Sequence, residues 1–164
     1  ISIIMKMNPK VAFVDFSSNF YDLHALHALS AYLKKHDIEP SYINAHSFSR
    51  MIFRIKKAAP DLLLYSAYTR DIKDYIRFDR LVKQRCKVKS IIGGPGPTFD
   101  WRNFGDSTID ALCLGEGEES LVEYIRNGFV PTKNIISVTD TVLPSRFTPF
   151  LDLNTVTRFQ IQRS

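Results

Sequence analysis

The chain has 164 residues, a length that predicts one domain. Its 45% apolar and 12% aromatic content excludes disordered and fibrous classes, and a net charge of +5 favours an acidic partner only weakly. No apolar run is long enough for a membrane helix, and residues 1–10 lack the order of an export signal. We therefore expect a soluble cytoplasmic protein without a membrane partner. Its only cysteines, Cys86 and Cys113, cannot ligate an iron-sulfur cluster by themselves.

The first half of the chain alternates between strand and helix patterns. Residues 10–16 predict a strand, and leucines at every third or fourth position from Leu23 predict a helix that ends at Lys35. Residues 40–45 predict a second strand, and residues 47–59 a helix capped by Ser47 or Ser49. The third strand, 61–68, is a continuous apolar run, which indicates burial on both faces in a parallel sheet.

The second half continues this alternation. Thr69 is expected to cap a helix that runs to Cys86, and residues 89–94 predict the fourth strand. Residues 94–98 predict a turn, 99–107 leave room for a short helix, and 110–115 predict the fifth strand. A helix at 121–126 is ended by Gly128, and an edge strand or hairpin follows Val130. We assign residues 1–130 to the domain and 131–164 to an edge strand and connector.

Strands that alternate with helices in this way predict an α/β fold. We expect a Rossmann-like (flavodoxin-like), doubly wound parallel sheet of about five strands with helices on both faces. In such sheets ligands bind over the carboxyl ends of the strands, so the loops that follow the strands are the candidate site.

The common nucleotide-binding signatures are missing from these loops. No G-x-G-x-x-G follows the first strand, and no G-x-x-x-x-G-K-[ST] is present. Ser17 and Ser18 resemble a flavodoxin phosphate loop without its glycine. Two functions stay open on these residues: a flavodoxin-like domain that binds FMN or a nucleotide, and a non-enzymatic interaction domain. Nucleic acid is not expected to bind the basic residues Arg77, Arg80, Lys83 and Arg85. Asp74 and Asp79 are interspersed among them, which is typical of a solvated helix face, and no aromatic stacking platform accompanies them.

Three strand-end loops together carry a resemblance. They are SAYTRD around Ser66, the Gly93-Gly94 pair with Pro95 and Thr98, and GEGE at 115–118. With KVAFVDF and ALSAYLKKHDIEP before them, these segments resemble, over about residues 10–126, the cobalamin-binding N-terminal domain of radical SAM enzymes. The resemblance implies cobalamin as cofactor. It also implies binding residues in four loops: Ser17, Ser18 and Asn19; Ser66, Ala67, Tyr68, Thr69 and Arg70; Gly93, Gly94, Pro95, Gly96 and Thr98; Gly115, Glu116 and Gly117.

Cobalamin is a broad corrin disc with a nucleotide tail. Gly93 and Gly94 would leave space for that tail, so we expect Gly94→Val to block its insertion. The fold should stay largely intact if the dihedral angles at the strand end permit a side chain. Ser66 would hydrogen-bond a tail nitrogen or the phosphate. Tyr68, Phe99 and Trp101 would offer apolar surface to the corrin, and Tyr65 is expected in the core. Glu118 and Glu119 are expected in the first turn of the last helix.

The histidine-ligated branch of corrinoid proteins carries D-x-H-x-x-G in the first loop. Here Asp22 and His24 fit, but His27 replaces the glycine. We therefore expect no catalytic residue and no metal ligand in this chain, with His24 as a cobalt ligand the open alternative.

The resemblance also implies a larger enzyme. The C-x-x-x-C-x-x-C motif of radical SAM domains is absent up to Ser164. We expect a [4Fe-4S] cluster and S-adenosylmethionine only in a radical SAM domain of the full-length protein, where methyl or other radical transfer would take place.

Overall fold

The computed structural model describes residues 8–15 and 23–139. Strands and helices alternate almost without interruption. In chain order they are β1 (Val11–Asp15), α1 (Leu23–Lys35), β2 (Ser41–Asn44), α2 (Phe48–Ala58), β3 (Leu62–Ser66), the 3-10 turn η2 (Thr69–Asp71), α3 (Ile72–Lys83), β4 (Lys89–Gly93), α4 (Pro95–Asp100), the 3-10 turn η3 (Trp101–Phe104), β5 (Ala111–Cys113), α5 (Glu118–Arg126) and β6 (Ile135–Ser137). Within the described ranges, no helix is both long and apolar enough to cross a bilayer.

These strands form one sheet in the order β2-β1-β3-β4-β5-β6. The first five strands are parallel, and β6 pairs antiparallel with β5. The predicted doubly wound, Rossmann-like fold is confirmed, and the sixth strand is the edge strand expected after Val130. The strand order reverses between β1 and β3, which is where open sheets of this kind bind ligands.

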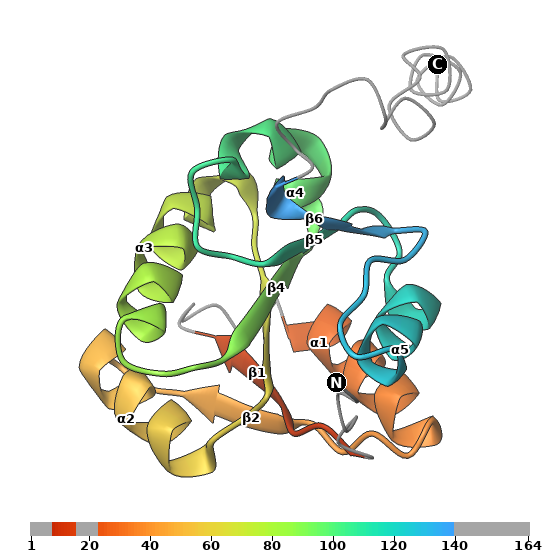
Figure 1. The fold of residues 1–164 in the computed structure, drawn as a ribbon, viewed down its shortest axis with the longest axis horizontal. Coiled ribbons are helices and arrows are strands. Elements are labelled where there is room, and N and C mark those ends of the chain that lie inside the picture. Colours follow the sequence, from red (N-terminus) through yellow and green to blue (C-terminus); the bar gives the residue numbers. More distant parts are fainter. Residues whose placement is uncertain (1–7, 16–22, 140–164) are drawn as a thin grey trace, which may run out of the picture.

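Two helical layers cover the sheet. Figure 1 shows α1 and α5 on one side and α2 and α3 on the other. Successive side chains of a strand point to opposite faces, so Leu62 and Leu64 pack in the core under α1 and α5, whereas Leu63 and Tyr65 pack under α2 and α3. Burial on both faces explains why the sequence of β3 is a continuous apolar run.

Helix starts follow the sequence in part. Ser47 caps α2, because its Oγ accepts the backbone N–H of Arg50 at 3.3 Å. The prediction for Thr69 is wrong, since it lies in η2 and α3 begins at Ile72. A helix, not a turn, occupies 95–100, because Pro95 at its first position has a helical φ and no N–H to satisfy.

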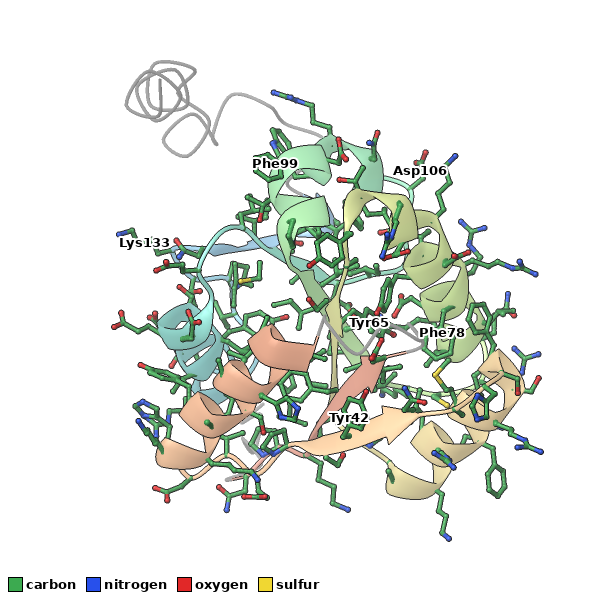
Figure 2. All side chains as sticks on the ribbon, turned by 180° about the vertical axis from the view of Figure 1, so that it is seen from behind. Tyr42, Tyr65, Phe78, Phe99, Asp106 and Lys133 are labelled. Carbon is green, nitrogen blue, oxygen red and sulfur yellow. The ribbon has the colours of Figure 1, made fainter. Side chains whose placement is uncertain are left out.

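A buried polar network lies between the sheet and α3. Asp79 is fully buried, contrary to the solvated helix face expected from the sequence. Its carboxylate accepts the hydroxyl of Tyr65 at 2.8 Å and that of Thr108 at 2.6 Å. Burial and the nearby Asp79 charge raise the pKa of Tyr65, so the phenol stays a neutral donor. Figure 2 shows Tyr65 beside Phe78 in this layer, with ring centroids 6.2 Å apart.

Asp110 extends this network toward the amino edge of the sheet. It pairs with Lys83, accepts Lys89 Nζ at 3.0 Å and accepts the Ser90 amide at 2.9 Å. Although burial acts to raise the pKa of Asp110, the hydrogen bonds from Lys83 and Ser90 lower it overall. Asp110 therefore contributes stability at neutral pH that is lost as pH falls through its folded pKa.

We predict that Tyr65→Phe lowers the free energy of unfolding by about 1–3 kcal/mol, because it removes a donor from a buried carboxylate. Urea unfolding followed by circular dichroism would measure the change. Tyr32→Phe is the control, because Tyr32 is only half-buried on α1. It should change the free energy of unfolding by less than ~0.5 kcal/mol. Equal unfolding midpoints for wild type and Tyr65→Phe would contradict the role given to this hydrogen bond.

Candidate functional site

A pocket of about 260 Å³ lies between the sheet and helices α1 and α5. Its floor is the row Phe13, Leu64 and Ile91, which are direct neighbours in the register of β1, β3 and β4. Two residues further along the strands, Ser66 and Gly93 are paired at its mouth. The side walls are apolar and come from both helices: Ala25, Leu26, Leu29 and Leu121.

Polar side chains of the described lining gather at the mouth. Ser66 ends β3, and Glu116 and Glu118 lie in the segment from β5 into α5. Tyr65 also borders the pocket, but its hydroxyl is hydrogen-bonded to Asp79 on the other face of the sheet. The pocket is therefore a slot with an apolar floor and a polar rim, open toward the carboxyl edge.

The structure brings some of the residues predicted for the site together and separates others. Six of them line the pocket: Ser66, Gly93, Gly94, Gly115, Glu116 and Gly117. Others follow β3 and β4 without contributing to its lining: Ala67, Tyr68, Thr69, Arg70, Pro95, Gly96 and Thr98. The predictions for Ser17, Ser18 and Asn19, and for the side chain of His24, fall outside what the structure describes.

The two adjacent glycines do different things. A Cβ at Gly93 would lie 3.3 Å from Cys113 Cβ, on the face of β4 that lines the pocket. Gly94 has a φ of +99°, and its Cβ would lie 2.9 Å from the carbonyl oxygen of Ala67. The condition under which Gly94→Val would leave the fold largely intact is therefore not met, because backbone packing and conformation both exclude a side chain there.

The loops after β3 and β4 are joined by their backbones. The Ala67 amide donates to the Gly93 carbonyl at 3.0 Å, and the Gly96 amide donates to the Ala67 carbonyl at 2.8 Å. A Cβ at Gly96 would lie 2.8 Å from that same carbonyl oxygen. The main-chain groups of Ala67 are thus used within the protein, and its side chain is in the α2/α3 core.

The aromatic residues near the site divide into buried and exposed ones. Tyr65 is in the core, as expected. Trp101 was expected to present apolar surface to a ligand, but it is only 2% exposed and packs in the α2/α3 core. Phe99 is 68% exposed on α4, where Figure 2 shows it pointing away from the domain. Tyr68 is half exposed and lies under the guanidinium of Arg70, with 5.7 Å from that group to its ring centroid.

The loop from Gly115 to Gly117 forms the wall on the β5 side. Gly115 has a φ of +74° and its Cβ would meet no atom within 4 Å, whereas a Cβ at Gly117 would lie 2.4 Å from Cys113 Sγ. Glu118 and Glu119 are in the first turn of α5, as predicted, where they complement the positive end of the helix dipole.

Sequence reasoning did not assign the floor residues Phe13, Leu64 and Ile91 or the side-wall residues of α1 and α5 to this site, and it also missed Cys113 and Asn134. Cys113 lines the pocket, and Asn134 donates from Nδ2 to the Glu116 carbonyl at 2.6 Å. The period of two along β5 could have placed Cys113 on the same face as Ala111. Asn134 had no such signal, because its role depends on the antiparallel return of β6.

Burial raises the pKa of the Cys113 thiol to about 12, and the nearby Glu118 adds to this effect. The group is therefore a neutral thiol at physiological pH, a small apolar side chain in the pocket wall and a poor nucleophile.

A pocket at the carboxyl edge of a doubly wound sheet, beside the reversal in strand order, defines a Rossmann-like ligand-binding domain. Residues 10–125 match the family model of the B12 binding domain, and the chain belongs to that family. This membership supports cobalamin as the ligand and does not favour the FMN or nucleotide alternative. The comparison with curated proteins gave no match.

We predict that Cys113 resists alkylation in the folded protein. With a pKa of about 12, only roughly one thiol in ten thousand is ionised at pH 8. Iodoacetamide labelling read out by peptide mass spectrometry should modify the less buried Cys86 much faster than Cys113. Both should react at similar rates in denaturant. Labelling of Cys113 as fast as Cys86 in the native protein would contradict the assigned burial.

Proposed function

We propose that this domain binds cobalamin with the nucleotide tail inserted in the slot between the sheet, α1 and α5. The observation that carries this proposal is the slot itself. Its volume of about 260 Å³ is below the roughly 300–1,000 Å³ typical of pockets that enclose a whole ligand, so it suits one part of a large one. The tail of cobalamin ends in a flat aromatic base, which an apolar floor accommodates by burial of its rings.

Each part of the slot has a separate role in this proposal. The row of Phe13, Leu64 and Ile91 would pack on the aromatic base, and the absence of a side chain at Gly93 keeps the slot open. The Ser66 hydroxyl, at the mouth, can hydrogen-bond a tail nitrogen or phosphate oxygen. When bound, cobalamin supplies a cobalt centre that can carry a methyl group or exchange single electrons.

The remaining predicted contacts belong to the rim. Gly115 to Gly117 line the mouth, and Tyr68 to Arg70 follow β3 at the same edge of the sheet, so the peptide groups of both segments would be partners for the amide substituents of a corrin ring. Ser17, Ser18 and Asn19 remain proposed contributors from the loop after β1.

Gly93→Val should weaken cobalamin binding by roughly tenfold or more, because its methyl groups would project into the slot beside Cys113 and overpack it. Retention of hydroxocobalamin after desalting, followed by titration in the visible spectrum, would measure this. Gly105→Val is the matched control: Gly105 is exposed, has a φ of −55° and follows η3 away from the pocket lining.

Cobinamide, which lacks the nucleotide tail, separates the tail from the corrin ring. It should bind the wild type more weakly than cobalamin does and should discriminate little between wild type and Gly93→Val. Tight FMN binding without retention of any corrinoid would reject the proposed function. Equal cobalamin affinity of wild type and Gly93→Val would reject insertion of the tail in this slot.

We further propose that no histidine of this chain coordinates cobalt. His27 is exposed on α1, whereas Leu26 and Leu33 of the same helix are buried, so His27 faces away from the slot. The glycine of D-x-H-x-x-G is also replaced by His27. His24→Ala and His27→Ala should each leave the absorption spectrum and the cob(II)alamin paramagnetic resonance of the bound cofactor unchanged. Loss of a nitrogen superhyperfine splitting in His24→Ala alone would assign that histidine as the lower ligand.

We also propose that the domain, about residues 1–130, serves a larger radical SAM enzyme that transfers methyl or other radical groups. The order of the three strand-end loops supports this proposal. In it, residues 131–164 would connect to the domain that holds the [4Fe-4S] cluster and S-adenosylmethionine. The adjoining coding sequence tests it directly: C-x-x-x-C-x-x-C should follow Ser164, and a different downstream domain would contradict it.

A further inference from the structure

Thr98 joins the two loops that follow β4 and β5. Its Oγ1 donates to the Gly94 carbonyl at 2.8 Å and accepts the Gly115 amide at 3.0 Å. A hydroxyl has one hydrogen to donate, and here that hydrogen is directed to Gly94. Thr98 does not line the pocket, although it was predicted to contact the cofactor. The hydroxyl therefore connects two parts of the protein at the mouth of the slot.

The loop that Thr98 reaches has little packing of its own at this point. Gly115 is in the left-handed region, and the space around its Cβ position is open to 4 Å. The Glu116 carbonyl accepts Asn134 Nδ2 at 2.6 Å, and the Asn134 carbonyl accepts the Leu114 amide at 2.8 Å. Thr98 thus holds the amide of Gly115, and Asn134 holds the carbonyl of the next residue, Glu116.

This loop is one wall of the slot, since Gly115, Glu116 and Gly117 all line it. Neither Thr98 nor Asn134 belongs to the described lining. We propose that Thr98 and Asn134 are positioning residues that pre-organise the Gly115–Gly117 wall for the cofactor without contacting it. This proposal rests on the cobalamin function above. Pre-organisation favours binding because a loop that is already ordered loses less conformational entropy when the ligand binds.

Thr98→Val tests this directly, because it keeps the shape of the side chain and removes both hydrogen bonds. In the cobalamin-free protein, exchange of the Gly115 amide, followed by NMR, should be roughly tenfold faster, as expected for loss of about one net hydrogen bond. The dissociation constant for hydroxocobalamin should rise by a similar factor, roughly tenfold.

Two variants serve as controls. Thr98→Ser retains the hydroxyl, so it should keep the slow exchange of the Gly115 amide and the wild-type affinity for hydroxocobalamin. Thr139→Val makes the same substitution at an exposed threonine. Thr139 follows β6, which is antiparallel and ends at the amino edge of the sheet, so this variant should change neither the exchange of the Gly115 amide nor the affinity for hydroxocobalamin. Asn134→Ala should also speed exchange in the loop. Combined with Thr98→Val, it should raise the dissociation constant by less than the product of the two single effects, because both residues hold one loop.

The two measurements separate the competing explanations. Weaker binding by Thr98→Val with unchanged exchange in the free protein would mean that Thr98 contacts the ligand, which overturns the proposal. Faster exchange with unchanged affinity would mean that the wall need not be ordered in advance, which also overturns it. If the wild type binds no cobalamin, the proposed function fails and the role in binding fails with it. The exchange comparison in the free protein still decides whether Thr98 holds the loop.

Discussion

The carboxyl edge of the sheet depends on the close approach of two backbones, the loop after β3 and the loop after β4. A Cβ at Gly94 or at Gly96 would lie 2.9 or 2.8 Å from the Ala67 carbonyl oxygen, so neither position has room for a side chain. This approach allows the Ala67 amide and carbonyl to bond Gly93 and Gly96. It also starts α4 immediately after β4, which brings Thr98 to the loop after β5. The mouth of the slot is thus built outward from one backbone contact.

The two faces of the sheet differ in how they are filled. Under α2 and α3 the core is closed by large side chains such as Phe78 and Trp101, and the buried Asp79 is hydrogen-bonded there by Tyr65 and Thr108. Under α1 and α5, the Gly93 position leaves the end of β4 without a side chain, and the slot begins there. A well-packed, hydrogen-bonded layer on one face can hold the strands in place while the other face remains hollow.

Much of the fold could be predicted from the sequence because its signals are local. The continuous apolar run of β3 and the leucine period of α1 each depend only on neighbours in the chain, and both predictions are confirmed. The candidate loops followed from the rule that parallel strands present their carboxyl ends at one edge. Six predicted residues do line the slot.

Two of the errors concern residues whose role depends on partners distant in sequence. Asp79 looked like part of a solvated helix face, but Tyr65 and Thr108, 14 and 29 positions away, provide its donors. Gly94 looked like space for a ligand, but its own φ and the Ala67 carbonyl decide its use. A helix pattern gives the direction of a charged side chain only approximately, and a glycine does not reveal which neighbour requires it.

Four glycines contribute backbone to the rim of the slot, beside the side chains of Ser66, Glu116 and Glu118, and this affects how substitutions there act. Gly93, Gly94, Gly115 and Gly117 have no side chains to present, so a ligand at the mouth would meet peptide groups whose directions are set by φ, by close packing and by the bonds of Thr98 and Asn134. A peptide group cannot be removed by mutagenesis, but its orientation changes when its supports change. Selectivity at this edge is therefore expected to be sensitive to residues just outside the contact surface, because they determine where the hydrogen-bonding groups of the rim point.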